Sequence, residues 1–194
     1  MAYKVTSGPN QEVLTRSEVR DWLKIRPDVT EEYDLLDGLI ATARVWAERN
    51  TGRALLTQTV QEVWDDPTAR CFYLSIGPLI SVTSFEYVDS SGAYQTWAST
   101  NYTVDSISNP GRVVIKPGII LPYSYTSIYP NCVKITYSVG ESDATAVDAN
   151  IKTAMLLMIG LMYENREDMP LGKERNPTAR SAWNLLSLSR LNWL

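Results

Sequence analysis

The stretch that decides the fold is Ala154–Met162, AMLLMIGLM, which runs directly into Tyr163–Glu167, YENRE. An ordinary surface helix carries one apolar stripe and one polar face, whereas the middle turns of this segment are apolar almost all the way round. The run is too short to cross a bilayer, which takes about 20 apolar residues. Protein must therefore cover this helix on more than one side, and the cover comes either from the chain's own sheet or from neighbouring subunits.

The surrounding C-terminal residues also predict helices. We expect the apolar helix to begin at about Asp148, and a second helix to begin at Asn176–Pro177, because Asn is a good N-cap and Pro fits the first helical position. The apolar positions of the first helix fall on two faces, Ile151, Met155, Met158 and Met162 on one and Leu157 and Leu161 on the other. Those of the second are Ala179, Ala182, Trp183 and Leu186.

Two helices are expected near the N-terminus, after a polar leader. Thr15–Glu18 has the pattern of a capping box, and the helix that it starts must stop before Pro27. Thr30 is expected to cap a second helix that ends at Asn50–Gly52. The core-facing stripe of this second helix consists of Leu36, Leu39, Ile40, Ala43 and Trp46.

From Leu55 the pattern changes to short segments rich in β-branched and aromatic residues. Asp89–Gly92 and Asn109–Gly111 are typical of hairpin turns. Residues 116–130 contain three prolines, which predicts a long loop or arm. The expected strands are Thr57–Trp64, Cys71–Ser75, Val82–Val88, Tyr94–Trp97, Tyr102–Asp105, Arg112–Ile115 and Val133–Ser138.

This order of elements predicts an α+β fold. The N- and C-terminal helices, residues 1–53 and 147–194, form a helical core, and residues 54–146 form an antiparallel β-rich lobe inserted into it. At 194 residues the chain is long enough to bury a sizeable core without disulfides. Cys71 and Cys132 are far apart in the sequence and are expected as reduced thiols. The N-terminus lacks the apolar core of a signal peptide, so synthesis in a reducing cytoplasm is expected.

The composition argues against an enzyme. The chain has no histidine, which excludes Ser-His-Asp and Cys-His catalysis and the usual zinc ligands. No glycine pattern for holding phosphates occurs. The paired carboxylates Asp65–Asp66 and Glu31–Glu32 are expected at a strand end and a helix start, not as a general acid and base. We therefore expect no cofactor and no metal.

The net charge and the aromatic residues are compatible with two kinds of protein, one that lets DNA pass and one that binds carbohydrates or surfaces. A net charge of −4 with interspersed signs argues against gripping DNA through many phosphates, but not against letting DNA pass. The six Trp and eleven Tyr suit surfaces that are dry on one side and wet on the other. One alternative is therefore a β-rich carbohydrate- or surface-binding module, with Trp64, Trp97, Tyr123 and Tyr125 as stacking platforms.

Several segments, in order, resemble the head–tail connector (adaptor) proteins of long-tailed bacteriophages and gene transfer agents. The likeness extends roughly from Leu14 to Glu167, and it is the order and spacing of the segments that make it specific. The segments are Leu35–Ala47, Asn50–Leu55, Pro78–Ser84, Asn101–Asp105, Pro110–Val113, Val133–Gly140 and Ile151–Glu167. Residues 116–130 are longer and richer in Tyr and Pro than this family leads one to expect.

The resemblance implies a structural, non-enzymatic protein of the virion head–tail junction. Such proteins form a ring, commonly of about twelve copies, between the portal protein and the next neck or tail-terminator protein, and genomic DNA passes through the ring without sequence-specific binding. No membrane is involved.

The resemblance also indicates which residues we expect to contact neighbouring proteins. The expected ring contacts are Met155, Met158, Met162, Leu157, Leu161 and Trp46. The expected portal- or partner-docking residues are Trp183, Leu191, Trp193 and Leu194, because an apolar chain end gains stability when it is covered. Tyr123, Tyr125 and Tyr129 are expected to reach a neighbour from the arm.

Overall fold

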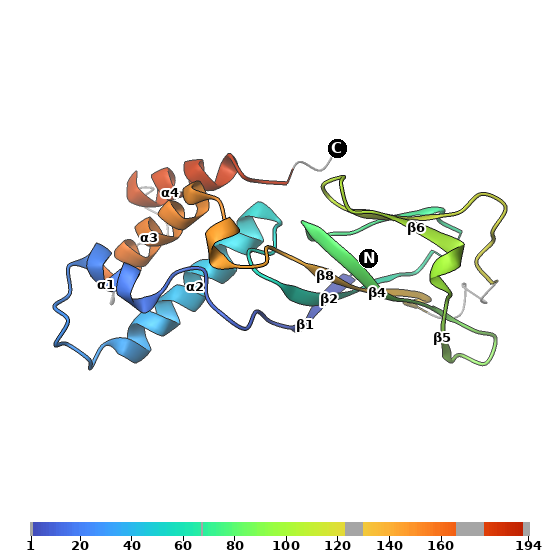
Figure 1. Ribbon diagram of the computed structural model, residues 1–194, viewed down its shortest axis with the longest axis horizontal. Coiled ribbons are helices and arrows are strands. Elements are labelled where there is room, and N and C mark those ends of the chain that lie inside the picture. Colours follow the sequence, from blue (N-terminus) through green and yellow to red (C-terminus); the bar gives the residue numbers. More distant parts are fainter. Residues whose placement is uncertain (1, 67, 123–129, 166–176, 192–194) are drawn as a thin grey trace. The chain divides into compact units, whose positions relative to one another are not determined.

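The computed structural model describes residues 2–66, 68–122, 130–165 and 177–191 (Figure 1). The chain divides into a helical unit, built from Asn10–Leu56 and Glu141–Leu191, and a β unit that contains Met1–Pro9 and Thr57–Gly140. The helices and the antiparallel sheets confirm the predicted α+β fold.

The helical unit consists of four helices in the described part of the chain. They are α1 (Arg16–Leu23), α2 (Tyr33–Thr51), α3 (Ala149–Glu164) and α4 (Pro177–Ser187), with a short 3-10 turn, η2 (Ala144–Ala146), before α3. The core contains Leu36 and Ile40 of α2, Ile151 and Met155 of α3 and Leu186 of α4.

Helix α3 packs against α1, α2 and α4, and Figure 1 shows it between α4 and α2. Its cover therefore comes from the other helices of its own unit, as the predicted helical core of N- and C-terminal helices requires. Along α3 the side chains of Ile151, Ala154, Met155, Ile159 and Leu161 are buried. The helices of the unit thus cover one side of α3 fully, while Leu157, Met158 and Met162 stay half-buried.

The helix ends test the predicted caps. The Thr15 capping box is present, since the Thr15 hydroxyl accepts from the Glu18 N–H and the Glu18 side chain accepts from the Thr15 N–H. Gly52 ends α2 with a φ of 71°, a backbone conformation that glycine adopts without strain. The prediction that Thr30 caps α2 is wrong: the carbonyl of Thr30 closes a separate turn with the Tyr33 N–H, and α2 begins at Tyr33.

The β unit contains two antiparallel sheets. The larger has the order β1 (Ala2–Ser7), β2 (Gln58–Trp64), β8 (Val133–Val139), β4 (Leu79–Val88), β5 (Tyr94–Thr96). The smaller has the order β3 (Cys71–Tyr73), β7 (Arg112–Ile115), β6 (Tyr102–Asp105). Strand β8 shows why these residues form strands, because buried Val133, Ile135, Tyr137 and Val139 alternate with more exposed polar residues.

Strand β1 is the element that sequence analysis missed, because residues 2–7 were expected as a polar leader. All six residues are exposed, so no apolar run marks them as a strand. They are held by antiparallel pairing with β2, from Ala2 opposite Val63 to Ser7 opposite Thr59. A pairing partner 50 or more residues away leaves no signal in the local pattern.

Aromatic rings join the two sheets. Phe72 of β3 lies edge-on to Phe85 of β4, with ring centroids 5.4 Å apart. Trp64 contacts Phe72 at 5.4 Å, and Trp97 contacts Phe85 at 5.0 Å. Several of the aromatic residues in which this chain is rich thus form part of the core of its β unit.

The turns of the β unit agree with the prediction where they are described. Asp89 closes the β4–β5 hairpin by accepting from the N–H groups of Ser91 and Ala93, at 2.8 and 3.1 Å. Asn109–Gly111 lies in the connection between the paired strands β6 and β7. Residues 116–122 form no strand, as expected for the arm, and residues 123–129 lie outside the described residues.

Candidate interaction surfaces

The described residues hold no group of side chains suited to a metal ion. Among them, no helix combines the length and the apolar character needed to traverse a membrane. A hollow in the helical unit is lined by residues that include Arg53, Leu55, Glu141 and Asp148. Its cavity volume is about 10 Å³, roughly the space of one water molecule, so it is too small for a substrate site.

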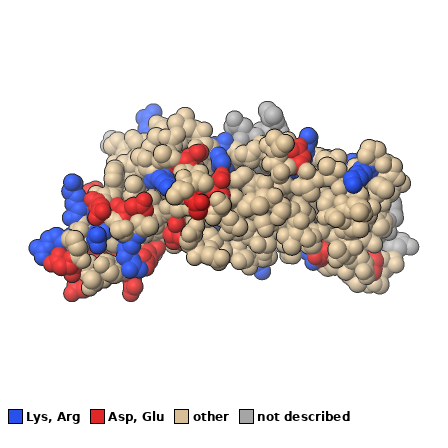
Figure 2. Space-filling view, viewed as in Figure 1, with Lys and Arg blue, Asp and Glu red and all other residues tan. Residues whose placement is uncertain are grey.

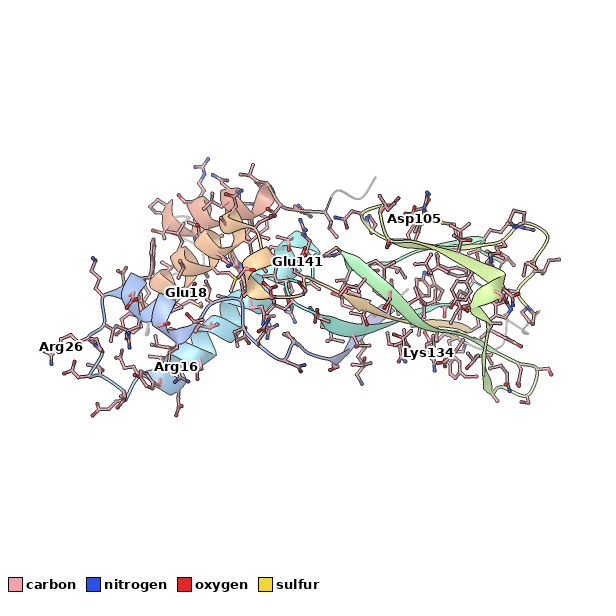
Figure 3. The ribbon with its side chains drawn as sticks, viewed as in Figure 1. Arg16, Glu18, Arg26, Asp105, Lys134 and Glu141 are labelled. Carbon is pink, nitrogen blue, oxygen red and sulfur yellow. The ribbon has the colours of Figure 1, made fainter. Side chains whose placement is uncertain are left out.

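Ion pairs occupy the wall of this hollow. The Arg53 guanidinium lies 3.7 Å from a Glu141 oxygen and 3.8 Å from an Asp148 oxygen. The Ser189 hydroxyl donates to Asp148 at 3.1 Å. These contacts join the end of α2 to the start of α3 and the end of α4, so the charged groups here stabilise the helical unit. Glu141 is labelled in Figure 3.

The paired carboxylates have structural roles. Glu32 accepts from the Tyr163 hydroxyl at 2.7 Å, which ties the start of α2 to the end of α3. Asp65 accepts from the Asn131 N–H at 2.6 Å, and Asp66 accepts from the Thr68 N–H at 2.8 Å. As expected from the sequence, the two pairs lie at the start of a helix and at the end of a strand.

One carboxylate of the β unit was not singled out by the sequence. Glu62 of β2 is completely buried and accepts from the Ser75 N–H at 2.9 Å and the Tyr137 hydroxyl at 2.8 Å, and also from the Ser75 hydroxyl. Burial raises the pKa of Glu62, although the hydrogen bonds from Ser75 and Tyr137 oppose the shift. Burial and the adjacent Glu62 carboxylate raise the pKa of Tyr137 as well. The group holds β2, β8 and the Ser75 loop together.

Charged side chains gather over the helical unit in Figure 2. Arg16 of α1 pairs with Asp37 of α2, and Arg44 of α2 pairs with Glu12 at 2.8 Å and with Glu48 at 3.2 Å. The Arg16–Asp37 pair is exposed and contributes little to stability, whereas the Arg44 pairs are partly buried. They do show that many charges of this unit are already paired within it.

The β unit shows fewer charged side chains in the same view (Figure 2). Lys134 of β8 pairs with Glu86 of β4 and lies over the Tyr94 ring, 3.9 Å from its centroid. In the β6–β7 hairpin, Asp105 accepts from the Ser108 hydroxyl at 2.7 Å and from Arg112 at 2.9 Å. Hydrogen bonds from Ser108, followed by Arg112, lower the pKa of Asp105 to about 2. Asp105 and Lys134 are labelled in Figure 3.

The residues expected at ring contacts lie in or beside the helical core. Met155 is fully buried and Leu161 is 8% exposed, so these two side chains are packed within their own unit and offer a neighbour almost no surface. This corrects the expectation for them. Met158, Met162, Leu157 and Trp46 are half-buried, and their ring contacts stay a prediction.

The residues expected to dock on a partner differ in exposure. Trp183 is 47% exposed on α4. Leu191 is only 5% exposed, and its N–H donates to the Thr51 carbonyl at 2.8 Å. Leu191 therefore packs on its own fold, which corrects the docking expectation for this residue. Trp193, Leu194, Tyr123, Tyr125 and Tyr129 lie outside the described residues.

Of the four proposed carbohydrate platforms, Trp97 is a core residue and Trp64 is half-buried. Trp97 is 6% exposed, and the half-buried Trp64 packs against Phe72. A stacking platform needs an open ring face, so the structure gives Trp97 no such role. The thiols agree with the prediction of reduced cysteines, since Cys71 and Cys132 are both free.

Sequence analysis missed one exposed face of the helical unit. Leu35 and Val45 of α2 are 38% and 39% exposed, and Gly38 and Thr42 lie between them on the same side. The signal was the spacing 35-38-42-45, which places these residues on the side of the helix opposite the buried stripe 36-40-43-47.

The fold is similar to that of chains in solved gene transfer agent (GTA) particles. A chain in the neck of an empty GTA particle, computed with C6 symmetry, matches with a TM-score of 0.78 and 21% identity over 100% of this chain and 97% of that chain. A chain in the neck of a native GTA particle, computed with C12 symmetry, matches with a TM-score of 0.73 and 23% identity over the same shares. A chain in the virion of a native GTA particle matches with a TM-score of 0.74 and 21% identity over 100% of this chain and 97% of that chain.

The chain has the fold of these neck chains. The resemblance to head–tail connectors is thereby confirmed at the level of the fold. No protein-family model and no curated protein matches the sequence.

Proposed function

We propose that this chain is a structural subunit of a connector ring in the neck of a tailed phage or a related particle. The observation that carries the proposal is the fold match to neck chains over the full length of both proteins. The symmetries of those necks, C6 and C12, support a ring, with twelve copies as the proposed number.

The proposed place of the ring is between the portal protein and the next neck or tail-terminator protein at the head–tail junction. Genomic DNA would pass through it without sequence-specific binding. The net charge of −4 supports this role, because a strongly basic wall would hold DNA through many phosphate contacts.

We propose Trp193 and Leu194 for the portal contact. Because Leu191 is buried in the helical unit, a deletion should start after it. Removal of residues 192–194 should leave the chain folded and reduce its retention on portals. Retention equal to that of the full chain would contradict the portal contact.

Native mass measurement of the full-length chain, alone and with its portal protein, tests the proposed function. We expect a complex that contains many copies of the chain on each portal assembly. A chain that remains monomeric and unbound at every portal concentration would contradict the proposal.

A further inference from the structure

The helical unit has two outer faces on different helices that could meet in a ring. The α2 face consists of Leu35, Gly38, Thr42 and Val45 with the adjacent Asp34, and the α4 face consists of Arg180, Trp183, Asn184 and Ser187. We propose that the α4 face of one subunit packs on the α2 face of the next subunit. This inference rests on the proposed ring and identifies its subunit contact.

The α2 face carries two large apolar side chains that are partly exposed. Leu35 and Val45 are 38% and 39% exposed, whereas the opposite side of α2 is buried in the core. A side of a helix that keeps two large apolar side chains in solvent is suited to contact with another protein surface.

Gly38 makes room in the middle of this face. A Cβ added at Gly38 would meet nothing within 4 Å, so packing within the subunit does not require glycine here. Glycine also weakens a helix interior relative to alanine. Its position between Leu35 and Val45 leaves a shallow place where a large side chain of another subunit can approach the backbone.

The α4 face supplies such a side chain. Trp183 is 47% exposed, while Ala182 and Leu186 bury the opposite side of α4. Arg180 and Ser187 are exposed on the same side as Trp183, at helical spacing. Trp and Arg are the residues most often found at the energetic centre of protein interfaces.

The charges of the two faces are complementary. The described part of α4 and the residues after it, 177–191, contain Arg180 and Arg190 and no acidic residue. The start of α2 carries exposed Asp34, and exposed Glu31 precedes it. Neither Arg180 nor Asp34 forms an ion pair with another described residue.

The spacing along the two helices also agrees. Trp183 lies three residues after Arg180, or about 4.5 Å along the helix axis, and Gly38 lies four residues after Asp34, or about 6 Å. If the two helices lie side by side and parallel, a register that places Arg180 opposite Asp34 also places Trp183 opposite Gly38. In this one register the opposite charges meet and the large Trp183 side chain faces the open site at Gly38.

A ring needs two different faces on each subunit. The α2 and α4 faces meet this requirement, because both helices pack on α3 and each turns its exposed side away from the core. One copy can then offer its α4 face to the next copy and receive the previous copy on its α2 face, as a cyclic arrangement demands.

The test is the amount of ring formed by full-length variants, measured by native mass spectrometry under the conditions in which the wild type assembles, with the portal protein if needed. We expect Arg180→Glu and Asp34→Lys each to reduce the ring population by at least about tenfold, because like charges then meet. The double variant Arg180→Glu/Asp34→Lys should restore most of it.

A second pair of variants separates assembly from folding. Gly38→Leu should abolish rings while the monomer keeps its circular dichroism and melts at or above the wild-type temperature, because the site is open in the single chain and leucine favours the helix more than glycine does. Thr103→Leu, at an exposed position of β6 outside the helical unit, is the control and should leave ring formation unchanged.

Normal rings in Gly38→Leu and in Arg180→Glu would overturn this contact and leave the proposed function standing. A wild-type chain that forms no ring even with its portal would overturn the proposed function, and the contact with it.

Discussion

At the scale of single residues, the most unusual group is the buried Glu62 carboxyl. A buried carboxylate is costly unless donors surround it, and Ser75 and Tyr137 supply those donors. The sequence shows Glu62 at an inward position of a strand but does not show that its partners come from the Ser75 loop and from β8. The sequence therefore indicates the position of Glu62 but not the residues that form hydrogen bonds with it.

The pH dependence of stability should report on Glu62. Since the folded chain raises the pKa of Glu62 above its ordinary value of 4.5, the folded state holds this proton more tightly than the unfolded state does. The contribution of Glu62 to stability is therefore fully present below the ordinary pKa and is lost as the pH rises through the raised one. Glu62→Gln should remove this loss, measured by urea unfolding between about pH 4 and 8.

Tyr137→Phe is the companion variant, because it deletes one donor and keeps the ring. We expect it to lower the free energy of unfolding by about 1.5–3 kcal/mol at neutral pH. Equal pH dependence in the wild type and in Glu62→Gln would show that burial of this carboxyl does not shift its pKa.

At the scale of elements, the sequence predicted what is decided locally. The capping box at Thr15, the end of α2 at Gly52 and the bounds of β6 and β7 are set by adjacent residues. The helices that cover α3 were predicted from the order of the elements, which placed the N- and C-terminal helices in one core, and α3 packs against α1, α2 and α4. Which of its apolar residues become fully buried was not predictable, because that depends on contacts between distant segments.

The same limit applies to β1 and to the contact residues. Strand β1 forms because it pairs with the edge of β2, and nothing within residues 2–7 indicates this pairing. Met155 and Leu191 are apolar in sequence terms, like Trp183, yet the first two are buried and Trp183 is 47% exposed. Only the packing distinguishes a core residue from a surface one.

The position of α3 within its own unit can be measured on the single chain. Met155→Ala should lower the free energy of unfolding by about 2–5 kcal/mol, because it leaves a cavity among α3 and its neighbours. Met158→Ala, at a half-buried position one turn away, should cost clearly less. Chemical denaturation of the monomer compares the two variants, and equal losses would contradict the burial described here.

At the scale of the whole molecule, the account depends on a ring. The fold matches chains from necks with rotational symmetry, and the helical unit has complementary outer faces. The arm expected from the sequence at residues 116–130 and the residues after Leu191 stay predicted contact sites for neighbours.

The most direct measurement is a cryo-EM reconstruction of the neck of a particle that contains this chain. The account predicts a closed ring of identical copies of this chain next to the portal, twelve if the C12 symmetry of the matched neck applies. A neck without this chain, or a single copy at another place in the particle, would contradict it.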